Sequence, residues 1–329
     1  MTKFVNTSTV LLPLAIILGL GIGSFFPDAG EPLSGLIDPL VFSLLALLFF
    51  EVRFEPLREA TRHVRFLSLA WLANFIIIPV LGWGLALLFF GSQPALFAGL
   101  LLYFLFPCTD WFLGFTRLAK GDVALGSVLL PINLISQLLL FPVYLAVFIG
   151  SQAGINFVEI WGTLLQWFLI PLCGAVLLRF VLSRLLPPAR FEVLPRLAGS
   201  LVSWVIAALV CCIFAHHAPT LIADLGAFLL ILLAVFVFFI LTSLLSEVLA
   251  RRFSLGHPQR ALLAMTTAAR NAPLVLGLAT IALPDQPLVY AALIIGMLVE
   301  FPHLTVLSQL LLRQKCEETT SSSKPITVS

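Results

Sequence analysis

Polar and turn-forming residues divide the chain into roughly ten apolar stretches. Each stretch has a length close to that of a helix that crosses a bilayer, which needs about 20 residues. Continuous stretches of this length favour helices over the alternating strands of a membrane barrel. Charged residues make up only 10% of the 329-residue chain, whereas soluble domains carry about 25%. The sequence therefore predicts an all-α polytopic membrane protein and excludes a soluble enzyme, a nucleic-acid binder and a disordered scaffold. The predicted spans are 8–26, 33–50, 66–90, 95–118, 123–149, 157–182, 197–216, 221–250, 261–283 and 287–312.

Basic residues mark one side of this predicted membrane protein. Every second loop is rich in Arg and Lys, and the loops between them contain neither. Of the 18 Lys and Arg residues, all except Arg270 lie in this set of loops or in the two tails. Because basic loops stay in the cytoplasm, we expect a multi-pass protein of the inner cell membrane with both termini cytoplasmic. The net charge of +2 is too small to indicate a nucleic-acid partner.

Short apolar motifs recur between the two halves of the chain. Pro13 has a counterpart in Pro171, and Pro142 in Pro302, at an offset of about 160 residues that points to an internal repeat. Each predicted half contains five spans. Because five is an odd number, the second half must cross the membrane in the opposite direction to the first. Inverted repeats are typical of secondary transporters, whose substrate site lies at the repeat interface. We therefore expect two five-helix repeats followed by a disordered cytoplasmic tail, at 1–150, 151–313 and 314–329.

Two of the predicted spans, the fourth and the ninth, carry helix-breaking sequence in mid-membrane. One contains Pro107 and the other Pro273, and proline removes a backbone donor and disfavours helix in the residue before it. Unwound backbone at that depth is tolerated only where it is buried in protein or lines a cavity. At the repeat offset, Asp110 in the first break falls opposite Arg270 in the second. The two breaks are therefore the predicted substrate site.

Three charged residues lie inside predicted spans, where burying a charge costs about 2.5–3.5 kcal/mol. Arg270 either binds substrate or pairs with Asp110 or Glu300 to hold the breaks together. Asp110 either caps the helix that follows the first break or belongs to such a pair. Glu300 either takes up and releases a proton near neutral pH or stays a neutral, hydrogen-bonded acid.

Uncharged polar residues complete the candidate site. Cys108 offers a soft sulfur suited to As(III), although buried cysteine is more often a small hydrophobic residue. Asn133 and Gln137 share one helix face, and they either line the substrate path or bind neighbouring helices together. The candidate substrate-binding residues are Cys108, Thr109, Asp110, Asn133, Gln137, Arg270, Asn271 and Glu300.

Two further motifs are interpreted as packing. The Cys211-Cys212 pair lies near His216, but adjacent side chains on a helix point about 100° apart, so we expect no metal site there. Gly19 and Gly23 partly match a nucleotide-binding loop, yet they lie inside a predicted membrane helix. We interpret them as a close-packing helix face.

At the two breaks, the chain resembles the bile acid:sodium symporter superfamily, and in particular its arsenite-permease branch. The resemblance is clearest from about 105 to 149 and from 260 to 313, and the ten-span layout extends it over nearly the whole chain. It is carried by Pro107-Cys108, Leu118-Ala119-Lys120-Gly121-Asp122, Asn133, Gln137, Thr267-Ala268-Ala269, Asn271, Leu298-Val299-Glu300 and Pro302.

The resemblance implies a ten-helix fold in which two broken helices cross inside a core domain, beside a panel domain. It also implies that Cys108 and Glu300 stand at the positions tied to transport, and that arsenite is exported in exchange for protons. This chain departs from that branch at Asp110 and Arg270, where small or neutral residues are usual. Sodium-coupled members carry a carboxylate in the second break, whereas this chain has a guanidinium there. We therefore expect proton coupling rather than sodium coupling.

Together these features predict a secondary active transporter that works by alternating access, with no enzymatic activity, cofactor or metal site. The first candidate substrate is arsenite or a related metalloid, exported in exchange for protons. The second is a small organic anion, taken up with Arg270 as its counter-charge. A third candidate is a channel-like or sensory membrane protein, which the broken helices and the repeat disfavour. The expected partners are a small-molecule or oxyanion substrate and the lipid bilayer, and the oligomeric state is left open.

Overall fold

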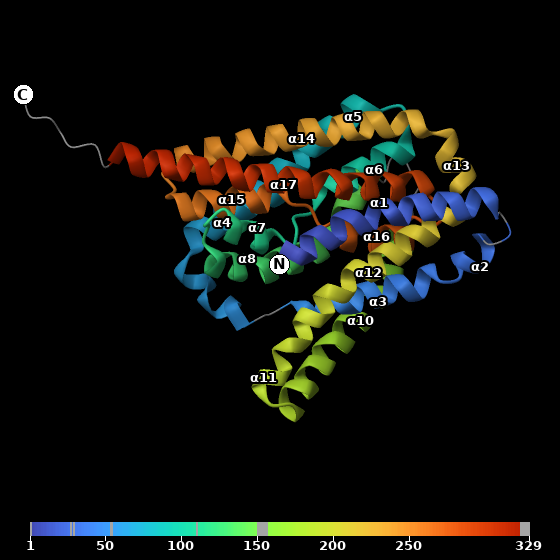
Figure 1. Cartoon of the computed structure of the whole chain (residues 1–329), viewed down its shortest axis with the longest axis horizontal. Coiled ribbons are helices and arrows are strands. Elements are labelled where there is room, and N and C mark those ends of the chain that lie inside the picture. The colour runs from blue at the N-terminus through green and yellow to red at the C-terminus, as the bar shows by residue number, and fades with distance from the viewer. Residues whose placement is uncertain are drawn as a thin grey trace, which may run out of the picture.

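The computed structural model describes residues 2–26, 28, 30–52, 55–109, 111–149 and 157–322, and these residues are almost entirely helical (Figure 1). Within them, six helical segments are long and apolar enough to cross a membrane. Shorter apolar helices cover 10–25, 94–105 and 272–282. The protein is therefore an all-helical polytopic membrane protein, as predicted. The six segments are Gly30–Glu51, Val64–Phe90, Val123–Phe148, Pro188–His216, Gly226–Arg252 and Pro287–Lys315.

Helices occur in every range that the hydropathy pattern predicts as a span. The first half contains α1 (Thr2–Phe25), α2 (Gly30–Ser34), α3 (Ile37–Glu51), η2 (Glu55–Arg62), α4 (Val64–Leu72), the π-helical turn η3 (Ala73–Ile77), α5 (Ile78–Phe90), α6 (Pro94–Leu105), α7 (Phe112–Leu118), α8 (Val123–Tyr144) and the π-helical turn η4 (Leu145–Ile149). The second half contains α10 (Phe157–Leu185), α11 (Pro188–Phe191), α12 (Val193–His216), α13 (Ala218–Ala223), α14 (Leu225–Arg252), α15 (His257–Ala268), α16 (Ala272–Ala282) and α17 (Pro287–Ser322).

The C-terminal helix is longer than the hydropathy pattern suggests. Helix α17 continues through residues 314–322, which belong to the tail expected to be disordered. The residues that follow Arg313 include Gln, Lys and Glu, which are good helix formers. Helix propensity therefore carries the segment beyond its apolar part, and residues 323–329 of the tail lie outside the described residues.

Both predicted helix breaks are present. Helix α6 ends at Leu105, and the next residue, Phe106, is extended because it precedes Pro107. Helix α15 ends at Ala268, and the next residue, Ala269, is also extended. Helix α16 begins with Pro273 in its first turn. Proline is tolerated there because an N–H in the first turn has no partner within the helix. Each break is therefore a short extended segment between two half-helices.

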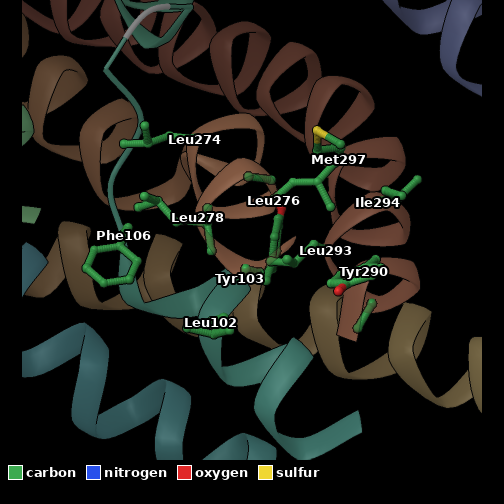
Figure 2. Packing of buried hydrophobic residues seen from close by; sticks show 14 of the residues in the cluster. Leu102, Tyr103, Phe106, Leu274, Leu276, Leu278, Tyr290, Leu293, Ile294 and Met297 are labelled. Atoms are coloured by element: carbon green, nitrogen blue, oxygen red, sulfur yellow. The ribbon is translucent and has the colours of Figure 1, made fainter. Parts of the chain in front are cut away.

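Buried apolar side chains form two clusters that meet at the breaks. The larger cluster joins α6, α16 and α17, where Tyr103, Leu276 and Met297 lie close together (Figure 2). The smaller cluster joins α4, α7, α8, α15 and the C-terminal part of α17. Phe106 belongs to the larger cluster, whereas Cys108 belongs to the smaller one. The breaks therefore lie where two separately packed groups of half-helices meet.

Helix α1 packs against α12 through two glycines. A Cβ atom on Gly19 would lie 2.6 Å from the carbonyl oxygen of Cys211, and one on Gly23 would meet the carbonyl oxygen of Ala215. Gly21, on another side of the same helix, would place a Cβ atom in open space. This confirms the interpretation of Gly19 and Gly23 as a close-packing face, which in a membrane depends on small residues.

We expect Gly23→Ala to lower the free energy of unfolding by about 1–3 kcal/mol, because the added methyl group meets backbone atoms of α12. The matched control is Gly21→Ala, which adds the same group to the same helix without a contact. That control should be neutral or gain up to about 1 kcal/mol from helix propensity. Thermal unfolding of the purified variants in detergent measures both effects, and equal stability of the two would contradict the close packing.

Candidate functional site

The two helix breaks pair with each other through their backbones. The Cys108 N–H donates to the Ala269 carbonyl at 3.0 Å, and the Asn271 N–H donates to the Phe106 carbonyl at 3.0 Å. These bonds flank an antiparallel bridge between Pro107 and Arg270. Buried polar backbone groups must find partners inside the protein when they lie in a membrane. The bridge supplies those partners, and it brings side chains from both breaks to one place.

The Arg270 side chain, which is completely buried, binds the ends of two half-helices. Its Nη1 donates to the Phe104 carbonyl near the end of α6 at 3.1 Å. Its Nη2 lies 2.9 Å from the carbonyl of Thr266 and 2.7 Å from that of Thr267, near the end of α15. The same nitrogen lies 3.4 Å from Asn74 Oδ1. Helix C-termini carry partial negative charge, so the guanidinium neutralises two such ends at once.

The described contacts of Arg270 differ from the side-chain ion pair with Glu300 considered from the sequence. Its guanidinium hydrogen bonds go to neutral carbonyl and amide oxygens, and its charged group lies 5.7 Å from the Phe238 ring centre. Glu300 is bonded to Arg270 through the backbone N–H instead. Asp110 lies outside the described residues, so its pairing with Arg270 and its capping role stay predictions.

Glu300 joins the site from the middle of α17. Its Oε1 accepts from the Trp111 indole N–H at 2.8 Å and from the Arg270 backbone N–H at 3.1 Å. Its Oε2 lies 3.2 Å from the Tyr103 hydroxyl, which also lies 3.0 Å from the Gly296 carbonyl. A Cβ atom on Gly296 would lie 2.5 Å from the Tyr103 ring. The absence of a side chain at Gly296 therefore lets the Tyr103 hydroxyl reach the carboxylate.

One peptide group connects Cys108 to Glu300. The carbonyl of the Ala269–Arg270 peptide accepts from the Cys108 N–H, and the N–H of the same peptide donates to Glu300 Oε1. Hydrogen bonds in such a chain polarise one another. Glu300 and the backbone of Cys108 are therefore hydrogen-bonded to opposite sides of the same peptide group.

A cluster of side-chain amides adjoins the second break. Asn271 Nδ2 donates to Thr109 Oγ1 at 2.9 Å and to Gln137 Oε1 at 3.2 Å. Asn133 Nδ2 lies 3.3 Å from Thr266 Oγ1. Three buried atoms of this cluster, Asn133 Oδ1, Gln137 Nε2 and Asn271 Oδ1, have no hydrogen-bond partner among the described residues. Buried polar atoms are nearly always paired, so these atoms are free to bind water or a small polar ligand.

The structure brings together the candidate residues that it describes. These residues are all buried and are linked through the breaks and through Thr266. The residues in question are Cys108, Thr109, Asn133, Gln137, Arg270, Asn271 and Glu300. Neither this site nor any other part of the described residues contains a group of three His, Cys, Asp or Glu side chains placed to hold a metal ion.

Three partners of the site were not among the candidates. Tyr103 and Trp111 bind Glu300, and Asn74 binds Arg270. The chain has 29 Phe but only 3 Tyr, so a tyrosine inside a span is a signal that the hydroxyl is needed. Asn74 carried a similar signal, as an amide within an apolar stretch.

Asn74 is placed by a distortion of its own helix. It lies in the π-helical turn η3, which precedes Pro79. Pro79 lacks an N–H, and the Phe75 carbonyl four residues earlier accepts from the Tyr144 hydroxyl instead. Turns of this type are frequent at functional sites. The turn allows Asn74 to accept from Arg270 while its Nδ2 donates to Thr266 Oγ1 at 3.0 Å.

We expect Arg270→Ala to lower the free energy of unfolding by at least about 1–3 kcal/mol, because buried carbonyls lose their donors. Arg270→Lys should retain part of the stability, since an ammonium keeps the charge but has three donors rather than five. Arg252→Ala, at the exposed end of α14, is the control. Thermal unfolding in detergent compares them, and an Arg270→Ala variant as stable as the control would contradict the capping role.

Comparison with known proteins gives relatives that include two arsenical-resistance proteins and a probable sodium/metabolite cotransporter. The Acr3 arsenical-resistance protein of Corynebacterium glutamicum is 27% identical over 142 residues, which are 40% of this chain and 38% of that protein. The Acr3 protein of Alkaliphilus metalliredigens is 24% identical over 190 residues, or 52% of this chain and 53% of that protein. A probable sodium/metabolite cotransporter of Oryza sativa subsp. japonica, BASS2, is 26% identical over 176 residues, or 53% and 42%.

These matches span from 38% to 53% of the length of the relatives. The Sodium Bile acid symporter family matches residues 38–223, which is more than half of the chain. This is a family of membrane transporters rather than enzymes, and the buried crossing of two broken helices fits such a protein. The chain belongs to the Sodium Bile acid symporter family.

Proposed function

We propose that the protein is a secondary active transporter that exports arsenite or a related metalloid in exchange for protons, by alternating access. The observation that carries this proposal is the single peptide group that bonds both Cys108 and Glu300. It joins the backbone of Cys108, whose side chain carries a soft sulfur suited to As(III), to a buried carboxylate that can bind a proton. The similarity to two bacterial arsenical-resistance proteins supports the same class of substrate.

The contacts of Glu300 provide a mechanism for proton exchange. As a carboxylate, it accepts hydrogen bonds from Trp111, Tyr103 and the Arg270 backbone, and such charge-assisted bonds are strong. Protonation turns one oxygen into a donor and weakens the bonds that hold the peptide group. Because that peptide also holds Cys108, proton binding at Glu300 and metalloid binding at Cys108 favour different states of the breaks. Exchange requires this kind of differential binding.

The polar atoms of the site favour a neutral substrate over an organic anion. Both terminal nitrogens of Arg270 already bind protein oxygens, and its Nε alone has no partner within the described part of the chain. The free oxygens of Asn133 and Asn271, with the Gln137 amide nitrogen, suit the hydroxyl groups of neutral arsenous acid. These contacts support metalloid transport ahead of anion uptake with Arg270 as the counter-charge.

The position of Arg270 also supports coupling that does not use sodium. Carbonyl oxygens at half-helix C-termini are the ligands with which transporters hold sodium ions. Here the guanidinium is bound by such oxygens from both broken helices. We propose that this fixed cation takes the place of a transported one, which leaves Glu300 as the group that couples transport to protons.

We further propose a topology of ten spans in two inverted repeats, at 1–150 and 151–313, in the inner membrane with both termini cytoplasmic. The support is that α6 and α15 end at the same bridge and that their extended segments pair in antiparallel fashion. Two half-helices that approach one point from opposite sides are the arrangement expected of an inverted repeat.

In vesicles that contain the purified protein, we expect transport of arsenite and antimonite but not of small carboxylates. Cys108→Ser should reduce metalloid transport at least tenfold, since a hydroxyl is a much poorer ligand for As(III) than a thiol. The matched control is Cys212→Ser, which changes another buried cysteine, in α12. This variant should retain transport. Full transport, or full arsenite resistance in a sensitive host, by Cys108→Ser would exclude the thiol role.

We expect a proton gradient to drive metalloid flux and a sodium gradient to have no effect. Glu300→Gln should abolish the response to the proton gradient, because the amide keeps an acceptor oxygen but cannot titrate. The control is Glu247→Gln, which changes a carboxylate that pairs with Arg251 and Arg260. This variant should keep the response to the proton gradient. Strict dependence on sodium, or proton-driven flux in Glu300→Gln, would refute the proposed coupling.

A further inference from the structure

An apolar groove opens between three helices outside the crossing of the breaks. Helix α3 lies beside both α10 and α12 (Figure 1), and the hollow between them has a volume of about 540 Å³. Every side chain that lines it is apolar. A volume of this size is within the range of about 300–1,000 Å³ that is usual for small-molecule sites.

Small residues create the hollow. Its lining includes Ala46 of α3, Gly174 of α10 and Ala198 of α12. In membrane proteins, small residues usually let helices approach closely, as Gly19 does in α1. Gly174 has a different role, because a Cβ atom there would meet no atom within 4 Å. The space that Gly174 leaves is therefore open, and another molecule can enter it.

The walls of the groove face the hydrocarbon of the membrane. Ile170 is 60% exposed, Leu178 is 52% exposed and Leu201 is 50% exposed. A membrane protein presents such side chains to lipid tails. The chemistry of the groove therefore matches a hydrocarbon chain.

One end of the groove carries a concentration of positive charge. Helices α10 and α12 are joined there by α11 (Figure 1), and residues 179–196 contain four Arg but only one Glu. Arg184 and Arg190 are exposed, as is the acidic Glu192. Arg179 donates to carbonyls at the end of α3, at 2.9 Å from Phe50 O and 2.7 Å from Val52 O. Basic sites between membrane helices bind anionic lipid headgroups.

We propose that this groove binds an acyl chain of an anionic phospholipid, and that Arg184 and Arg190 hold its phosphate group. The apolar hollow accounts for the chain, and the excess of arginine at its α11 end accounts for the headgroup. This lipid site is separate from the proposed metalloid site, whose described residues do not line the groove.

The test uses the full chain, purified in detergent and incubated with phosphatidylglycerol or phosphatidylcholine, with retained lipid counted by native mass spectrometry. We expect the protein to retain more phosphatidylglycerol. Gly174→Phe should abolish retention because the ring fills the hollow. Gly226→Phe is the matched control, since a side chain there also meets no atom within 4 Å but lies on α14.

The headgroup site is tested separately. Arg184→Gln with Arg190→Gln should weaken phosphatidylglycerol binding about fivefold per arginine, whereas Arg252→Gln should not.

Equal retention of the two lipids by the unmodified protein would overturn the proposal, as would unchanged phosphatidylglycerol binding in Gly174→Phe. If Gly174→Phe fails to fold, the arginine variants decide, and unchanged lipid preference in the double variant overturns the proposal. A dimer that Gly174→Phe dissociates without loss of lipid would show that a second copy of the chain covers the groove, and this outcome also overturns it.

Discussion

Backbone that leaves a helix inside a membrane must find its hydrogen-bond partners within the protein, and the two breaks of this protein provide them to each other. The bridge between Pro107 and Arg270 holds together the C-terminal ends of α6 and α15 and the start of α16. Helix α17 joins this point because Glu300 accepts the Arg270 N–H. The positions of Cys108, Asn271 and their neighbours all follow from this pairing, which is why the site is buried and continuous.

Charge at the crossing is balanced by the chain itself. Two helix C-termini point at the same place, and their partial negative charges need a cation. Arg270 supplies it permanently, since a guanidinium does not lose its proton in proteins, and a fixed group cannot be loaded and released as a free ion can. In the proposed mechanism, Arg270 therefore keeps the crossing stable while Glu300 changes its charge. The two roles meet at one residue, because the Arg270 backbone N–H binds Glu300 and the Arg270 side chain binds the helix ends.

Sequence reasoning found much of this site because the residues involved are unusual for their surroundings. A proline such as Pro107 breaks a helix wherever it stands, and a lone Arg270 in an apolar stretch stands out against a composition with 10% charge. The partners of these residues were harder to find. Whether Arg270 binds Asp110, Glu300 or carbonyls depends on how helices far apart in the chain approach one another. Trp111 carries no local signal that its indole N–H binds a carboxylate on α17.

The sequence by itself determined that this is a helical membrane protein, where its helices run and where two of them break. Hydropathy, proline chemistry and isolated charge are local properties, and the physics of a bilayer converts them directly into structure. Only the tertiary structure decided that one peptide group bonds both Cys108 and Glu300 and that a guanidinium occupies a cage of helix-end carbonyls. It also decided that Gly174 borders an open groove, whereas Gly19 lies in a close contact between helices α1 and α12. Each of these depends on the distance between segments remote in sequence, which no local pattern contains.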